Sequence, residues 1–164
     1  MTLPPELKIT VRRLFDRLRP RCVFAPLGIG GHRDHLIARD LVTQEALRRK
    51  VLVFYYEDLP YVATLTPSKV RAHARSIDPN LRATQVPIDI AAKVNNLTIY
   101  RSQVTAAELQ IVSDYSLQSG AGQPVERLWT AASKSDLSNI FHSPGELFFE
   151  APFAKQPQAG PPTE

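Results

Sequence analysis

Cysteine is almost absent from this sequence of 164 residues, in which Cys22 is the single one. One cysteine cannot form an internal disulfide or a zinc centre built from cysteines. A reducing, cytoplasmic setting is therefore expected. The sequence also lacks a run of about 18 apolar residues, so no membrane-spanning helix is expected. The first residues hold no apolar segment of the kind that a signal peptide needs.

Acidic residues are scarce near the start of the chain, and the net charge of +4 comes from basic residues in the first 50 positions. Arginines 12, 13 and 17 alternate with Leu14 and Leu18 at helical spacing, which is typical of the solvated face of an amphipathic helix. No aromatic interleaving or nucleic-acid motif accompanies them. Nucleic acid is therefore not an expected partner, and a basic nucleic-acid or membrane-surface binder stays the weaker alternative.

Helical and strand patterns alternate along the first third of the sequence. A helix is predicted after Pro4 and Pro5 and ends near Pro20. An apolar strand at 22–25 leads into a glycine-rich loop at 26–31, a helix at 36–49 and a strand at 51–56. This alternation predicts an α/β fold in which helices cover a mainly parallel sheet.

The second half contains more helix-start signals than strand signals. Helices are predicted to begin at Thr66, after Asp89 and at the capping box of Thr105, and strands are predicted at 81–86 and 125–131. One domain over residues 1–150 is expected. The proline-rich segment 151–164 has no apolar period and is predicted to be a disordered tail.

The segment with the clearest chemistry is Gly-His-Arg-Asp-His at 31–35. His32 and His35 are three residues apart, so both imidazoles can face one side at the start of a helix. They are candidate zinc ligands, and Asp34 between them could ligate the metal or orient a histidine. A chance His-x-x-His pair remains the alternative. The loop in front lacks the Lys-Ser/Thr of a phosphate-binding loop.

A second candidate segment follows the strand at 51–56. In parallel sheets, ligands bind beyond the carboxyl ends of strands, where the glycine loop and the next loop would both lie. Gly30, Gly31, Glu57 and Asp58 are therefore predicted to contact a substrate. The two carboxylates could also act as an acid, a base or a partner for an arginine, or serve only as turn residues.

Four blocks of the sequence resemble the PIG-L (LmbE-like) deacetylases. The block at 26–35 resembles their second metal-site motif, and Tyr-Glu-Asp-Leu-Pro-Tyr at 56–61 follows it after a helix and a strand. Lys93 with Tyr-Arg-Ser-Gln at 100–103, and Glu-Arg-Leu-Trp at 126–129, come in the order that the family shows.

The resemblance implies a zinc-dependent amidohydrolase that removes acetyl groups from N-acetylglucosamine-type substrates on a Rossmann-like, three-layer fold. It implies that His35 is a zinc ligand and that His32 stabilises the oxyanion or protonates the leaving amine. Asp34 would orient its neighbours.

The family's first motif, His-Pro-Asp-Asp-Glu, has no counterpart, and no histidine precedes His32. The chain is therefore expected to be the carboxyl-terminal part of such a fold, with an incomplete zinc site and little or no activity alone. An upstream polypeptide would supply the missing ligands, and an exposed sheet edge would favour self-association. The alternative is a non-catalytic remnant or carbohydrate-binding module of the same fold.

Overall fold

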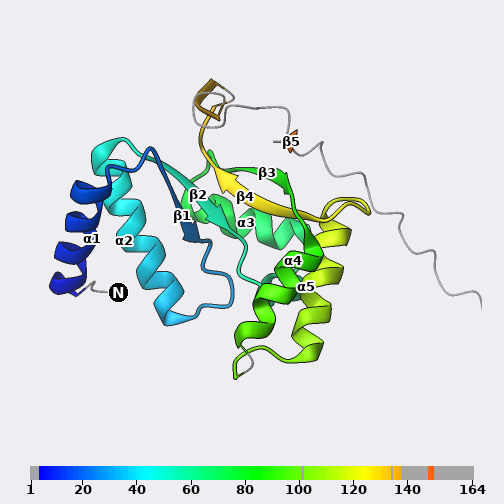
Figure 1. Cartoon of the computed structure of the whole chain (residues 1–164). Helices are drawn as coiled ribbons and strands as arrows, with labels where there is room; N and C mark the ends of the chain where they lie inside the picture. The colour runs from blue at the N-terminus through cyan, green and yellow to red at the C-terminus, as the bar shows by residue number, and fades with distance from the viewer. Residues whose placement is uncertain (1–3, 101, 134, 138–147, 150–164) are drawn as a thin grey trace, which may run out of the picture.

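The computed structural model describes residues 4–100, 102–133, 135–137 and 148–149, and shows helices alternating with strands (Figure 1). The elements in chain order are α1 (Pro5–Leu18), β1 (Cys22–Pro26), α2 (Arg33–Arg49), β2 (Leu52–Tyr56), the 3₁₀ helix η1 (Tyr61–Thr64), α3 (Pro67–Ile77), β3 (Arg82–Pro87), α4 (Ile90–Leu97), the 3₁₀ helix η2 (Thr98–Tyr100), α5 (Ala106–Ser119), β4 (Val125–Thr130) and β5 (Phe148–Phe149).

The predicted elements are confirmed to within a few residues, because their start signals form real caps. The side chains of Thr66 and Asp89 accept hydrogen bonds from the backbones of α3 and α4. Thr105 and Glu108 form the expected capping box of α5. The predicted tail at 151–164 lies outside the described residues.

The strands form one sheet in the order β1-β2-β4-β3-β5. Only β1 and β2 pair in parallel among the described strands, whereas β4 pairs antiparallel with both β2 and β3. The expectation of a mainly parallel sheet is therefore wrong for this part of the chain, although the α/β class is confirmed. The two antiparallel pairings mean that β1, β2 and β3 share one direction, and that β4 is inserted between β2 and β3 in reverse.

Neighbouring residues on the strands pack into two separate clusters, one on each face of the sheet. Ala25, Tyr55, Ala83 and Trp129 lie in register on one face and pack with apolar residues of α2, α3 and α5. Phe54 and Leu128 point to the other face and pack with Ala132 and Leu137. The described residues thus place helices mainly on one face, and they do not build the complete three-layer arrangement that the resemblance implies.

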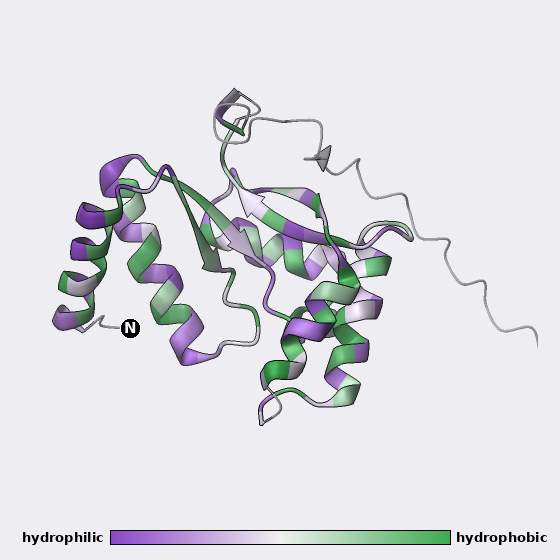
Figure 2. Ribbon diagram, in the orientation of Figure 1, coloured by the Kyte–Doolittle hydropathy of each residue, from purple (hydrophilic) through white to green (hydrophobic). Residues whose placement is uncertain are grey.

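Helix α1 packs beside α2 at one side of the molecule (Figure 1). Phe15 is its single buried residue, whereas Leu7, Leu14 and Leu18 on the same helix are exposed. Figure 2 shows hydrophilic residues over much of α1 and hydrophobic ones along β1. No helix of the described residues is long and apolar enough to cross a membrane.

Candidate functional site

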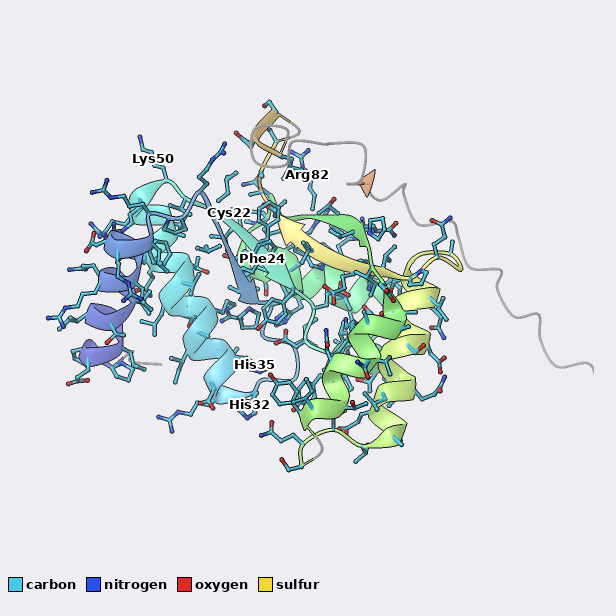
Figure 3. All side chains as sticks on the ribbon, in the orientation of Figure 1. Cys22, Phe24, His32, His35, Lys50 and Arg82 are labelled. Carbon is cyan, nitrogen blue, oxygen red and sulfur yellow. The ribbon has the colours of Figure 1, made fainter. Side chains whose placement is uncertain are left out.

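The glycine loop and the start of α2 lie where the parallel strands β1 and β2 end. The amide of Leu27 donates to the carbonyl of Tyr56 at 2.8 Å, which extends the β1–β2 pairing up to the loop. Figure 3 shows His32 and His35 together at the first turn of α2, with Phe24 farther back along β1. The glycine loop and the turn after β2 thus lie together at the carboxyl ends of the two parallel strands, and ligand binding there remains a prediction.

Three glycines of the loop, including Gly28 at φ +82°, have backbone angles that other residues rarely adopt. Gly30 has φ +89° and Gly31 has φ +72°. A Cβ atom on Gly30 would lie 2.7 Å from Cγ of Tyr61, so glycine is required by contact as well as by conformation. The half-exposed Tyr61 ring therefore lies directly against the loop.

Asp58 connects the glycine loop to His35. Its side chain has no exposed surface. One carboxylate oxygen, Oδ2, accepts hydrogen bonds from the amides of Gly28 at 2.7 Å and Ile29 at 3.0 Å. The other oxygen, Oδ1, lies 2.6 Å from Nδ1 of His35. A single buried carboxylate thus fixes both the loop backbone and one imidazole ring.

His32 occupies the N-cap of α2, and its Nδ1 accepts a hydrogen bond from the amide of Asp34 at 3.3 Å. The rings of His32 and His35 have centroids 5.2 Å apart, as the spacing predicts. Asp34 itself is exposed, and within the described residues its carboxylate is seen in no hydrogen bond with either ring. The carboxylate that orients a histidine here is Asp58.

Glu57 lies in a buried network beside the site. Its Oε1 accepts from the indole of Trp129 at 2.8 Å, and its Oε2 accepts from Tyr115 at 2.5 Å and from Arg127 at 3.1 Å. Burial and the negative charge of Glu57 raise the pKa of the Tyr115 hydroxyl. The network attaches α5 and β4 to the turn after β2. Of the roles that the sequence left open for Glu57, the observed one is that of a partner for an arginine.

The predicted substrate contacts of Gly30, Gly31, Glu57 and Asp58 remain predictions. The four residues lie in the two loops at the strand ends, but both carboxylates are buried and already accept hydrogen bonds from protein donors. Gly30, Gly31 and His32, by contrast, are exposed.

His73 was not singled out by any sequence pattern, yet it supports the loop. Its Nε2 lies 3.1 Å from the carbonyl of Leu27, which also accepts from Arg39 at 3.4 Å. His73 is on α3, 46 positions after Leu27, and such a distant contact leaves no spacing signal in one sequence. The roles of Arg127 and Tyr115 were missed for the same reason.

The motif blocks at the carboxyl side also meet in space. Lys93 of α4 forms an ion pair with Glu126 of β4. Glu57 binds Arg127 and Trp129 of the same strand. Polar contacts therefore connect the glycine loop, the turn after β2, Lys93 and β4, although they are far apart in the sequence.

Zinc fits this site only in part. Neutral imidazole is a good zinc ligand, and the contact of His35 Nδ1 with a carboxylate is typical of a zinc-bound histidine. Catalytic zinc normally has three protein ligands. No group of three His, Cys, Asp or Glu residues suited to a metal occurs within residues 4–100, 102–133, 135–137 and 148–149. The described residues therefore offer His35 as a candidate ligand and hold no three-ligand site.

No family model matches the sequence, and no curated protein matches it. Solved structures of deacetylases are similar in fold. A deacetylase–teicoplanin complex from the teicoplanin biosynthesis pathway superposes with a TM-score of 0.63 at 22% identity, over 76% of this chain and 48% of that one.

Two further deacetylases show the same likeness. The A40926 pseudoaglycone deacetylase Dbv21 has a TM-score of 0.56 at 17% identity, over 78% of this chain and 57% of that one. The zinc-inhibited form of teicoplanin deacetylase Orf2 has a TM-score of 0.51 at 18% identity, over 76% and 50%. The chain spans about half the length of these structures. At these identities the likeness concerns architecture alone, so the chain has the fold of part of these deacetylases.

Proposed function

We propose that this chain forms one side of a metal-dependent hydrolase site that removes the acetyl group from an N-acetylglucosamine-type amino sugar. The observation that carries the proposal is the contact between His35 Nδ1 and the buried carboxylate of Asp58 at 2.6 Å. This contact orients the ring and leaves its Nε2 as the atom that can meet a metal.

The residues around His35 suit the same chemistry. His32 is exposed beside it and can donate a hydrogen bond to an amide carbonyl or a proton to the leaving amine. Gly30 and Gly31 allow a substrate to approach the backbone closely. Zinc, when bound, would polarise the amide carbonyl and activate water. Asp34 would hold His32 through its backbone amide.

A second polypeptide segment would complete the site. β1 is at the end of the strand order and pairs with β2 alone among the described strands. A strand that paired in parallel with the outer side of β1 would end beside the glycine loop, where residues following it could reach His35. A segment encoded upstream of this chain is the proposed source, and self-association through the same edge is the competing use of it.

Zinc titration of the purified chain, followed by calorimetry, tests the proposed metal ligand. We expect weak binding that is lost in His35→Ala and retained in His73→Gln, which keeps a donor for the Leu27 carbonyl. Acetate release from N-acetylglucosamine derivatives is then measured with zinc, with and without the upstream polypeptide. If the mixture binds no zinc and releases no acetate, the proposal is wrong.

A sugar-binding module without chemistry is the second candidate. It is favoured by the lack of a three-ligand group among the described residues. Binding of N-acetylglucosamine that is unchanged by a chelator and by His35→Ala would support this candidate against the first.

A further inference from the structure

We infer that His32 and His35 are held in opposite tautomers, so that one ring presents a lone pair and the other presents an N–H group at the same place. A neutral imidazole carries its single proton on either Nδ1 or Nε2, and the partner of one nitrogen decides the state of the other. The two rings meet partners of opposite kind, and both partners belong to the protein itself.

His35 faces an acceptor. The Asp58 carboxylate has no proton to give, so the 2.6 Å contact requires that Nδ1 of His35 be the donor. Asp58 is fixed in this role because its other oxygen accepts the amides of Gly28 and Ile29 and its side chain is fully buried. The neutral His35 ring therefore has its lone pair on Nε2.

His32 faces a donor. The backbone amide of Asp34 can only donate, so the 3.3 Å contact requires that Nδ1 of His32 be the acceptor. The contact is also the N-cap hydrogen bond of α2, so it stabilises the start of the helix. The neutral His32 ring therefore has its proton on Nε2, opposite to His35.

The lone pair of His35 and the N–H group of His32 therefore lie on neighbouring rings, whose centroids are 5.2 Å apart. The lone pair of His35 suits a cation or a proton to be removed. The N–H of His32 suits an electron-rich oxygen, such as that of an amide carbonyl. This use of the pair rests on the proposed function, whereas the tautomers themselves do not.

Long-range ¹H–¹⁵N correlation of the ¹⁵N-labelled full chain measures the tautomers directly. The spectra are recorded at alkaline pH, because a ring has a defined tautomer only when it is neutral. The spectra of His32→Gln and His35→Gln assign the two rings among the four histidines of the chain. We expect the Nδ1–H form for His35 and the Nε2–H form for His32. The same form for both rings, or the reverse assignment, would overturn the inference.

Asp58→Asn provides the second arm. The asparagine can keep its oxygen toward the two loop amides and turn its amide group toward His35, which then becomes an acceptor at Nδ1. We expect the His35 signal to switch to the Nε2–H form while His32 is unchanged. Asp40→Asn, on the same helix, is the matched control and leaves both rings unchanged. If Asp58→Asn does not fold, the wild-type spectrum alone still decides.

Zinc added to the wild-type sample separates the inference from the proposed function. A zinc-dependent shift at Nε2 of His35 supports both. Opposite tautomers without any effect of zinc would sustain the inference and contradict the role of His35 as a metal ligand.

Discussion

The indole Nε1 of Trp129 donates a hydrogen bond to Oε1 of Glu57 at 2.8 Å, and this bond joins the middle of the sheet to the turn that carries the site. Trp129 lies on β4, next to Tyr55 of β2. Glu57 directly precedes Asp58, the residue that orients His35. The reversed strand therefore supports the site through one buried carboxylate.

Replacing Trp129 with phenylalanine should destabilise the fold by about 1–3 kcal/mol, because Oε1 of Glu57 loses its donor while remaining buried. Urea unfolding followed by circular dichroism measures the change. Tyr56→Phe is the matched control, since this half-exposed hydroxyl has no hydrogen-bond partner among the described residues, and it should cost less than about 0.5 kcal/mol. Equal effects of the two variants would contradict the role given to the indole.

Removing Arg127 should be more severe than removing the indole. Arg127→Met leaves the buried Glu57 charge without its cation, which typically costs about 3–5 kcal/mol. The double variant Glu57→Gln/Arg127→Met should recover part of this loss, because the uncompensated charge is gone. A double variant that is less stable than the sum of both single changes would count against the ion pair.

The stability of the α1–α2 contact should depend on acid pH through Glu45. Hydrogen bonds from Arg48, and further from Arg49, lower the pKa of Glu45 from its ordinary 4.5 to about 2. Arg12 of α1 also faces this carboxylate, at 3.8 Å. Between these two pH values the unfolded chain binds a proton that the folded chain does not, so stability falls as pH falls.

Unfolding free energies of wild type and Glu45→Gln, measured between pH 5 and pH 2, test this dependence. We expect the difference between the two proteins to shrink as the pH decreases, because the wild type alone loses the Glu45 contribution. Other carboxylates titrate in both proteins and cancel in the difference. A difference that is constant with pH would show that the Glu45 pKa is not lowered by folding.

Gly30→Ala should disturb the glycine loop more than Gly31→Ala. Both positions have positive φ, which costs about 1–3 kcal/mol for a residue with a side chain. At Gly30 the new Cβ would also meet Tyr61 at 2.7 Å, whereas at Gly31 no atom lies within 4 Å. Thermal unfolding of both variants measures the difference, and adding Tyr61→Ala to Gly30→Ala should remove most of it.

The boundaries of helices and strands could be predicted because their signals are local. Thr105 and Glu108 are three residues apart, and Asp89 stands directly before its helix, so the caps are visible in a short window of sequence. The direction of β4 could not be predicted, because it depends on which strand lies beside it. Its nearly continuous burial suits either direction.

The two histidines could be found from their spacing, whereas the residues that orient them could not. Asp34 stands between His32 and His35 and was the natural candidate to orient them. The structure gives that position to Asp58, 23 residues after His35, because the parallel pairing of β1 and β2 brings the two loops together. A single sequence does not show which residues of distant loops come into contact.

The thin attachment of α1 has a kinetic consequence. Phe15 is its one buried residue, under the guanidinium of Arg49, and the exposed ion pair of Asp16 with Arg49 adds to the contact. Local opening of such an element requires far less free energy than global unfolding. Amide hydrogens of α1 should therefore exchange with solvent well before those of β1 and β2, so the helix can detach while the sheet and its histidine site stay folded.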